Sequence, residues 1–147
     1  MTNTGPVLTT DDVVDYLKEV FPQVFEMEDT VVVEAVGHNT ARVRQIIDRR
    51  HLRPGGTISG PTMFRLADLA LYVAILAQIG KVGLAVTTNL NINFLRKPSE
   101  QDLIAECRLF KVGARLAVGE VLIYSEGTED PVAHATGTYS IPPGSKR

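Results

Sequence analysis

One long apolar segment constrains this chain more than any other feature. After Pro61 the sequence TMFRLADLALYVAILAQ is apolar on nearly all sides of a helix, and Gly80 follows as a candidate C-cap. Proline suits the first helical turn, so we predict a helix from Pro61, with Ser59 or Gly60 in the cap region. Its most apolar part, residues 66–79, is shorter than the roughly 20 residues that span a bilayer. A helix that is apolar all round must be enclosed by other elements.

The segments around this helix have the pattern of β-strands. They are rich in β-branched residues or alternate apolar with polar residues, and turn residues separate them. Consecutive strands with short connections favour an antiparallel sheet. We therefore predict an α+β fold, in which a curved antiparallel sheet wraps around the one long helix. The predicted strands are residues 30–36 and 40–47 before the helix, and 84–95, 102–110, 116–125 and 132–141 after it.

A shorter helix is expected near the N-terminus. Thr10 supplies a capping hydroxyl before two acids in the first turn, and Pro22 follows the last helical position. The chain has 147 residues, with no internal repeat and no linker. We predict one domain, with the N-terminal helix at about 10–21 and the core at about 30–141.

Charge and cysteine content exclude several classes of function. The formal net charge is −2, which gives no global attraction to nucleic acid or to an acidic membrane surface. The single cysteine, Cys107, cannot form an intrachain disulfide and is expected to be a small core residue. The histidines are scattered, so no cluster has metal-site spacing. His51 is near the glycine-rich stretch and could be catalytic, but beside two arginines it is expected at the surface. No secretory signal is visible, and a cytoplasmic location is expected.

Asp68 is the residue of the long helix that most needs an explanation. It lies two turns into the helix among apolar side chains, where an unpaired charge is costly. The helix dipole does not explain it, because that effect fades within the first turn. A carboxylate held in such a place is a candidate general base or nucleophile. Equally, it could be a structural group that caps a loop or pairs with Arg65.

The second candidate feature is the glycine-rich stretch GGTISGP, residues 55–61, which cannot be regular structure throughout. Glycine allows the backbone to approach a ligand closely, and the start of a helix presents free N–H groups. The N–H of Gly60 could therefore polarise a carbonyl or hold an oxyanion. A tight loop that merely needs glycine would explain the same residues.

Together these residues resemble a known family. The sequence GGTISGPTMFRLAD, residues 55–68, is similar to the signature of hotdog-fold acyl-CoA thioesterases of the phenylacetate-pathway (PaaI-like) type. The resemblance continues through AVTTNLNINFLRKP, residues 85–98, and covers roughly residues 30–141 with the same order of elements. It implies the hotdog fold, in which a curved antiparallel sheet wraps one long helix.

The resemblance also implies the chemistry, which is hydrolysis of an acyl-CoA thioester to the free acid and CoA. Asp68 matches the family's carboxylate, which attacks the thioester carbonyl or activates water. Gly60 matches the glycine whose N–H binds the carbonyl oxygen, and Thr87 falls where related enzymes have a serine or threonine near the attacking water. No metal or other cofactor is implied, and coenzyme A is part of the substrate.

The chain departs from the family at two positions. The family's histidine before the glycine is Ser59 here, and its asparagine or glutamine falls on Arg53. Arginine cannot accept a hydrogen bond as an amide does, although it can donate one to the thioester carbonyl or to a CoA phosphate. Alternatively, Arg53 pairs with Asp68 and silences it.

The resemblance further implies a homodimer, or a dimer of dimers, in which two sheets join edge to edge and the active site lies between subunits. The strand at residues 86–95 has few charges to protect an edge, and an unprotected edge favours a partner. Asn89 alternates with two more asparagines on one face of it, which suits an interface, a substrate site or a solvated face. Candidate cations for the CoA phosphates lie at strand ends and turns: Arg96, Lys97, Lys111 and Arg115.

Two alternatives stay open beside the thioesterase. A non-catalytic acyl-CoA or small-acid binding protein on the same fold would explain Ser59 and Arg53. A hotdog hydratase or dehydratase would use an Asp/His pair in a local motif that the sequence does not contain. The helix side chains Leu71, Tyr72 and Ile75 predict an apolar pocket but do not separate an aryl from an alkyl substrate.

Overall fold

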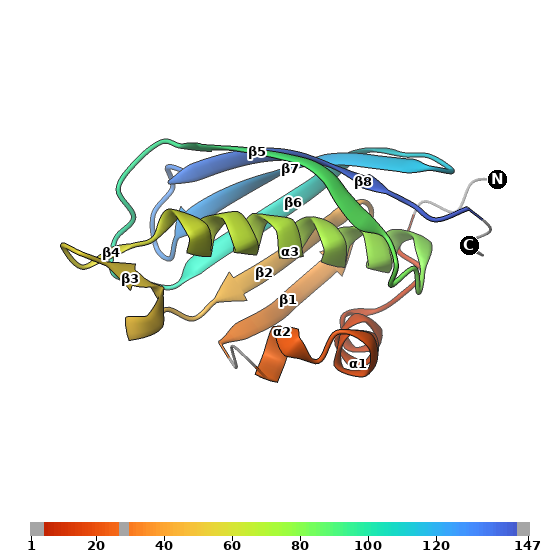
Figure 1. Ribbon diagram of the computed structural model, residues 1–147, viewed down its shortest axis with the longest axis horizontal. Coiled ribbons are helices and arrows are strands. Elements are labelled where there is room, and N and C mark those ends of the chain that lie inside the picture. The colour runs from red at the N-terminus through yellow and green to blue at the C-terminus, as the bar shows by residue number, and fades with distance from the viewer. Residues whose placement is uncertain (1–4, 27–29, 144–147) are drawn as a thin grey trace.

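The fold comes from a computed structural model, which describes residues 5–26 and 30–143. Six antiparallel strands form the main sheet in the order β1-β2-β6-β7-β8-β5. The sheet curves behind the long helix α3 (Gly60–Ile79), and the helices α1 (Thr10–Val20) and α2 (Gln23–Glu26) lie below it in Figure 1. This architecture confirms the predicted α+β hotdog fold with an additional N-terminal helix. The strands are β1 (Val31–Gly37), β2 (Thr40–Gln45), β5 (Val86–Phe94), β6 (Leu103–Val112), β7 (Leu116–Ser125) and β8 (Ala133–Ser140).

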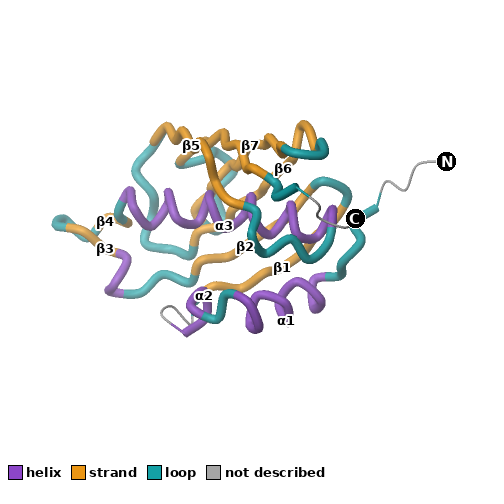
Figure 2. Tube along the Cα trace, turned by 45° about the vertical axis from the view of Figure 1, so that its right-hand side comes forward, coloured by secondary structure: helices purple, strands orange, loops and turns teal. Residues whose placement is uncertain are grey.

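Helix α3 is enclosed, as its sequence predicts. Its N-cap is Ser59, whose hydroxyl oxygen accepts a hydrogen bond from the N–H of Thr62 at 3.3 Å, and Gly80 is its C-cap. Every side chain from residue 70 to residue 77 is buried. The tube view, turned by 45°, shows the same helix lying along the sheet (Figure 2).

Two glycines allow the sheet to approach α3 closely. A Cβ on Gly137 of β8 would stand 2.6 Å from Cδ1 of Leu71, and a Cβ on Gly119 of β7 would stand 3.1 Å from Cδ2 of the same leucine. The first distance is shorter than a Cβ tolerates, and on Gly119 the Cβ would also stand 2.8 Å from the backbone oxygen of Arg108. The central strands therefore need glycine at the points where Leu71 rests on them.

The length argument against a membrane span does not hold for α3. The helix has 20 residues and begins at Gly60, so by length and composition it is long and apolar enough to cross a membrane. Burial decides the question instead, because 72% of its most apolar window is buried inside the fold. This helix has the surroundings of a core helix.

The N-terminal helix begins with a different cap from the one predicted. The N-cap is Thr9 rather than Thr10: its hydroxyl accepts a hydrogen bond from the N–H of Asp12 at 3.1 Å, and the Asp12 carboxylate accepts one from the N–H of Thr9 at 3.0 Å. This reciprocal pair satisfies two backbone donors at once, which a cap at Thr10 would not do. Helix α1 packs on the core through Val13 and Leu17, which are both fully buried.

The connection from β2 to α3 holds a 3-10 helix (η1, Arg49–His51) and two short strands, β3 (Leu52–Arg53) and β4 (Thr57–Ile58). His51 is 1% exposed, so the expectation of a surface histidine was wrong. Its ring contacts the core side of this connection: Nδ1 accepts a hydrogen bond from the N–H of Asp48 at 2.9 Å, and Nε2 lies 3.3 Å from Nε2 of the buried Gln45. Cys107 is buried as predicted, and burial raises the pKa of its thiol to about 12.

Strand β5 forms an edge of the sheet. Among the described strands it pairs with β8 alone, and a bulge interrupts the pairing between Thr87 and Asn89. None of its residues carries a charge. Val86 is 56% exposed and Phe94 is 53% exposed, so apolar side chains at both ends of β5 remain open to solvent.

Candidate active site

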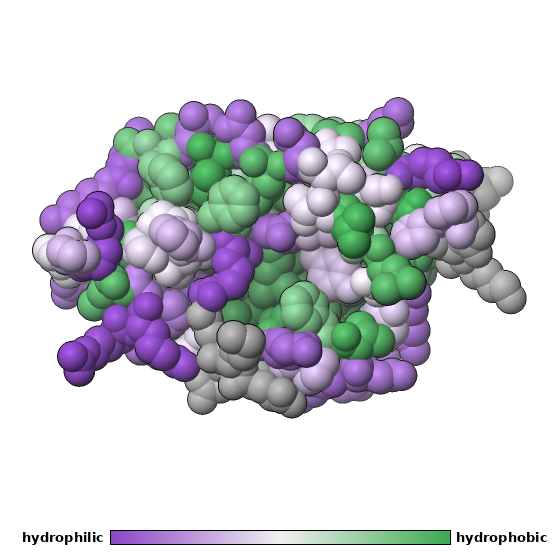
Figure 3. All heavy atoms as spheres, in the orientation of Figure 1, coloured by the Kyte–Doolittle hydropathy of each residue, from purple (hydrophilic) through white to green (hydrophobic). Residues whose placement is uncertain are grey.

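A cavity of about 600 Å³ opens between the α1–α2 junction, the middle of α3 and the start of β5. Figure 3 shows a hollow with apolar atoms near the centre of this face. Its volume lies within the range of small-molecule sites.

Tyr72 lines this cavity as predicted, whereas Leu71 and Ile75 are buried in the core. The apolar wall includes Val20, Phe21 and Val24, and the polar wall includes Arg65, Asp68 and Thr87.

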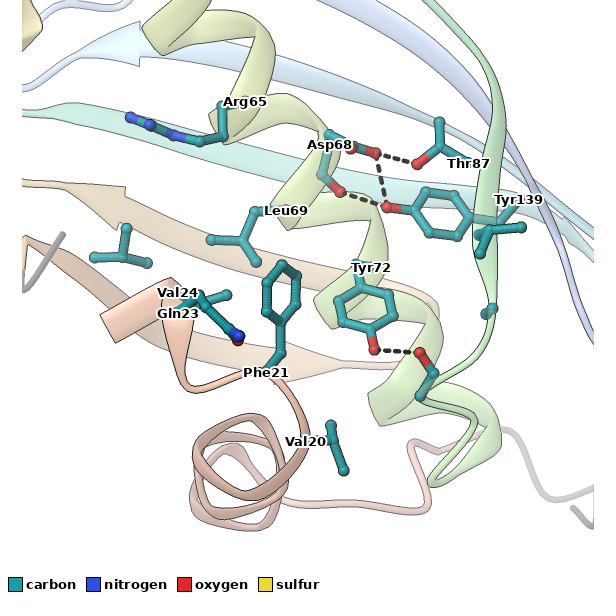
Figure 4. A pocket seen from close by; sticks show the side chains of 14 residues that line it. Val20, Phe21, Gln23, Val24, Arg65, Asp68, Leu69, Tyr72, Thr87 and Tyr139 are labelled. Carbon is teal, nitrogen blue, oxygen red and sulfur yellow. Dashed lines mark hydrogen bonds between the residues drawn. The ribbon is translucent and has the colours of Figure 1, made fainter. Parts of the chain in front are cut away.

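Asp68 lies on the wall of this cavity, and one of its carboxylate oxygens is held from two sides. The Thr87 hydroxyl donates a hydrogen bond to Oδ1 at 2.6 Å, and the Tyr139 hydroxyl lies 2.7 Å from the same atom and 3.0 Å from the Asp68 backbone oxygen (Figure 4). Within residues 5–26 and 30–143, no hydrogen bond or ion pair engages Oδ2. Arg65 points away from Asp68, so the expected alternative of a pair between them is not formed. Asp68 is half-buried and lines the cavity, so its carboxylate can meet a ligand there.

Tyr139 is a member of this group that sequence reasoning missed. It is 4% exposed, and burial together with the Asp68 carboxylate raises the pKa of its hydroxyl. The hydroxyl therefore stays protonated and acts as a donor. Thr87 and Tyr139 are cross-strand partners on β5 and β8. The sequence contained a signal for Tyr139, because it is a large side chain at an inward position of β8. The other inward positions of that strand are all small: Ala133, Ala135 and Gly137.

A row of aromatic rings leads from this carboxylate to the α1–α2 junction. Tyr72 stacks on Tyr139 with ring centroids 6.0 Å apart, and Phe21 meets Tyr72 edge-on at 6.3 Å. The Tyr72 hydroxyl donates a hydrogen bond to the backbone oxygen of Gly83 at 2.8 Å, and burial raises its pKa. Both tyrosine hydroxyls are thus satisfied within the fold, and their rings add apolar surface to the cavity.

Gly60 and Asp68 do not meet within one chain. Gly60 is the first residue of α3, so its N–H has no partner within the helix. Asp68 lies about 12 Å further along the helix axis, at a rise of roughly 1.5 Å per residue. Gly60 lies instead against the end of β5, where a Cβ on it would stand 3.2 Å from Cζ of Phe94. The predicted donor and carboxylate are therefore at opposite ends of β5, because Thr87 near the start of that strand binds Asp68.

The two departures from the family pattern lie at the Gly60 end. Ser59 is engaged in the helix cap, and its Oγ also lies 2.8 Å from Oγ1 of Thr62. Arg53 is on the β3–β4 hairpin with an exposed side chain. Over the described part of the chain, no hydrogen bond or ion pair joins Arg53 to Asp68. The predicted silencing pair is therefore absent within one chain.

The remaining candidates are spread along the sheet. Asn89 is exposed on β5. Arg96 and Lys97 follow the end of that strand, and the Arg96 guanidinium donates a hydrogen bond to a backbone carbonyl at 2.7 Å. Lys111 and Arg115 flank the β6–β7 turn at the opposite end of the sheet. These five residues do not line the cavity. Among the residues that the structure describes, no group of three or more His, Cys, Asp or Glu side chains could hold a metal ion.

Comparison with known proteins assigns the family. A family model described as the thioesterase superfamily matches residues 55–132, which include Gly60, Asp68 and Thr87. This chain belongs to the thioesterase superfamily. A solved structure of a candidate thioesterase from Silicibacter sp. TM1040 is 48% identical, covers 95% of this chain and 96% of that one, and superposes with a TM-score of 0.85.

More distant proteins extend the likeness to the superfamily. A candidate esterase of Saccharolobus solfataricus is 28% identical over 139 residues, which are 95% of this chain and 89% of that protein. A mutant of the phenylacetic acid degradation protein PaaI from Thermus thermophilus is 25% identical, with a TM-score of 0.69 over 81% of this chain and 98% of that one. The predicted PaaI-like resemblance is thus confirmed, and superfamily membership supports a hydrolase. A hypothetical thioesterase from Streptococcus pneumoniae, solved with coenzyme A, shares the fold at 18% identity and a TM-score of 0.76, over 89% of this chain and 99% of that one.

Proposed function

We propose that this protein hydrolyses an acyl-CoA thioester to the free acid and CoA, with Asp68 as its catalytic carboxylate. The observation that carries the proposal is the setting of Asp68 on the wall of an apolar cavity. Thr87 and Tyr139 hold Oδ1, which leaves Oδ2 for a reacting group. A carboxylate oriented in this way suits a general base or a nucleophile. Membership of the thioesterase superfamily supports the same chemistry.

Two routes use the same carboxylate. As a general base, Oδ2 takes a proton from a water molecule whose oxygen attacks the thioester carbonyl. The tetrahedral intermediate then collapses, the C–S bond breaks, and the proton passes to the CoA sulfur. As a nucleophile, Oδ2 attacks the carbonyl itself, the C–S bond breaks, and CoA leaves as the thiolate, which takes a proton from solvent. Water then hydrolyses the mixed anhydride, which releases the free acid and regenerates the Asp68 carboxylate. Both routes need an ionised Asp68 and a donor at the carbonyl oxygen.

In this proposal the carbonyl donor is the N–H of Gly60 from a second protomer. One carbonyl cannot contact both groups of a single chain, because about 12 Å of helix separates them. Two-fold symmetry pairs a strand with its copy in the antiparallel sense. Pairing β5 with its copy therefore sets the Phe94 end of one strand, with Gly60, beside the Thr87 end of the other, with Asp68.

The character of β5 supports a homodimer of this kind. An edge strand without charges and with exposed apolar ends is a template for pairing with another strand. Asn89 is exposed on this edge strand and is a candidate for the interface. The same pairing brings Arg53, Arg96 and Lys97 toward Asp68 of the partner subunit, where they become candidates for the thioester carbonyl and the CoA phosphates. Lys111 and Arg115 lie at the other end of the sheet, where β5 begins, and remain phosphate candidates on the side of Asp68 of their own chain. A dimer of dimers keeps the same site.

Thiol release from short, medium and aryl acyl-CoAs tests the proposal. Asp68→Asn keeps the size of the side chain and removes its charge, so we expect release to fall by about 10²–10⁴-fold while the fold is retained. The matched control is Asp15→Asn, which makes the same change at an exposed position of α1 and is expected to keep full activity. Unchanged release by Asp68→Asn would rule out this mechanism.

A non-catalytic acyl-CoA binding protein is the second candidate, and Ser59 and Arg53 favour it. The Ser59 hydroxyl is engaged in the helix cap, and an arginine cannot accept a hydrogen bond. This candidate predicts that S-alkyl-CoA thioethers bind in a calorimeter while no acyl-CoA releases thiol. Release that depends on Asp68 would exclude it, and so would a failure to bind any CoA derivative.

A further inference from the structure

The apolar end of the cavity is built by a segment outside the family match. Val20, Phe21, Gln23 and Val24 come from the α1–α2 junction, whereas the matched region begins at residue 55. Backbone hydrogen bonds fix this junction: the N–H of Phe21 donates to the oxygen of Leu17 at 2.7 Å, and the N–H of Val24 donates to the oxygen of Phe21 at 3.1 Å. Leu17 is fully buried, so the junction is anchored to the core.

Phe21 points from this junction into the cavity, between Leu69 and Tyr72 (Figure 4). Its ring contacts Tyr72 edge-on and is still 43% exposed. A ring left this open contributes little to filling the core, because much of its apolar surface stays in contact with water. That surface is available to an apolar ligand in the cavity.

The cavity has a polar wall and an apolar wall. Asp68, Thr87 and the Tyr139 hydroxyl form the polar wall, and Val20, Phe21 and Val24 form part of the apolar one. Of the described residues that line the cavity, Arg65 alone carries a positive charge, and it lies one helical turn from Asp68. A substrate with its carbonyl at Asp68 would therefore extend its tail toward Phe21. A charged tail would lose its hydration there without gaining a counter-charge.

We propose that Phe21 is a specificity-determining residue, which stops the acyl group and sets the longest chain that the site accepts. This inference rests on the proposed function, because it takes the cavity as the acyl site of a thioesterase. The substrate class is an acyl-CoA whose acyl group is uncharged, apolar and of limited length. Phe21 contacts the tail of the acyl group and not the reacting atoms, so it acts on discrimination between substrates.

Chain-length profiles of kcat/KM, from butanoyl-CoA to hexadecanoyl-CoA, test this role. Phe21→Ala removes the ring and lengthens the cavity toward α1, so we expect the optimum to move to longer chains. The ratio of kcat/KM for a long over a short chain is expected to rise about tenfold or more. Val24→Phe adds a ring to the same wall and is expected to move the optimum to shorter chains. The matched control, Phe110→Ala, removes a 54% exposed ring of β6 that does not line the cavity, and is expected to keep the wild-type profile.

Binding measurements separate this inference from the proposed function. The dissociation constants of S-alkyl-CoA thioethers of increasing length are measured for the wild type, Phe21→Ala and Val24→Phe by calorimetry. A shift of the preferred length in the variants, without hydrolysis by any protein, would support the role of Phe21 and overturn only the proposed hydrolysis. Hydrolysis with one unchanged optimum in all three proteins would overturn the role of Phe21 alone. If thermal unfolding shows that Phe21→Ala is not folded, the direction of the shift in Val24→Phe decides.

Discussion

The two walls of the cavity are held in different ways. The wall around Asp68 is fixed by hydrogen bonds from Thr87 and Tyr139, and it belongs to the sheet and the core helix. The wall from the α1–α2 junction is apolar, and its side chains Val20 and Phe21 are 44% and 43% exposed. Orientation of the carboxylate therefore depends on the core, whereas the shape of the cavity depends on side chains that the core does not need.

Truncation of one side chain under each wall tests whether the two walls contribute differently to the stability of the core. Leu71→Ala leaves a void between α3 and the two glycines of the sheet, so we expect it to lower the free energy of unfolding by about 2–5 kcal/mol. Val24→Ala shortens a half-buried side chain at the junction and is expected to cost less than about 1.5 kcal/mol. Urea unfolding measures both. Equal losses would show that the junction is as much a part of the core as α3.

Removal of the Gly60 N–H extends the comparison to the start of α3. Gly60→Pro deletes the donor at a position where proline is tolerated, since Ser59 is already extended at φ −74° and ψ 150°. We expect kcat to fall by about 10²–10³-fold, as for loss of one oxyanion donor. The matched control is Gly60→Ala, which places the same Cβ against Phe94 but keeps the N–H. Equal losses in both variants would assign the effect to the Cβ and not to the donor.

A smaller effect is expected from the donors that orient Asp68. Tyr139→Phe removes one of the two hydrogen bonds to Oδ1, and we expect kcat to fall about tenfold, the effect of a hydrogen bond to a charged group. The preferred chain length should not change, in contrast to Phe21→Ala. Tyr124→Phe makes the same chemical change away from the cavity and serves as the control. A change of chain-length preference in Tyr139→Phe would show that the two walls are not independent.

The smallest effect concerns stability at alkaline pH. The pKa values of Tyr72 and Tyr139 are raised in the folded protein, chiefly by burial. A tyrosine in the unfolded chain has a pKa of about 10. The contribution of the two buried hydroxyls to stability is therefore complete below about pH 10 and is lost as the pH rises above it. Urea midpoints measured from about pH 8 to about pH 11 should therefore fall at the alkaline end, and less so in Tyr139→Phe. Identical pH profiles for the two proteins would contradict this account.

The sequence predicted the elements of the fold better than their arrangement. The period and length of α3 and the alternation within the strands are local signals, so these elements were found close to their true bounds. Strand β5 was expected at an edge of the sheet, but its partner was not predicted, because β5 leaves its neighbour in sequence, β6, and pairs with β8. That pairing depends on how the whole sheet closes around α3. The burial of His51 was also missed, since its partners Asp48 and Gln45 become visible only in three dimensions.

The candidate site divides in the same way. Asp68 and Thr87 were identified from the helix pattern and the family resemblance, and the structure brings them together at 2.6 Å. Tyr139 and Phe21 were not, because Tyr139 approaches Asp68 from 71 residues away and Phe21 belongs to a helix end that no local pattern links to a cavity. Gly60 was also identified, but its separation from Asp68 by about 12 Å of helix within one chain was not drawn from the sequence.

A heterodimer of one Gly60→Pro chain and one Asp68→Asn chain tests directly whether the active site is shared between two subunits. With two different affinity tags, co-expression yields this heterodimer, and its thiol release is compared with that of each variant alone and of the wild type. If each site combines Gly60 of one chain with Asp68 of the other, one of the two sites is intact. The heterodimer should then have about half of the wild-type activity per dimer, although both parent variants are inactive. A heterodimer as inactive as its parents would contradict a site shared between two subunits.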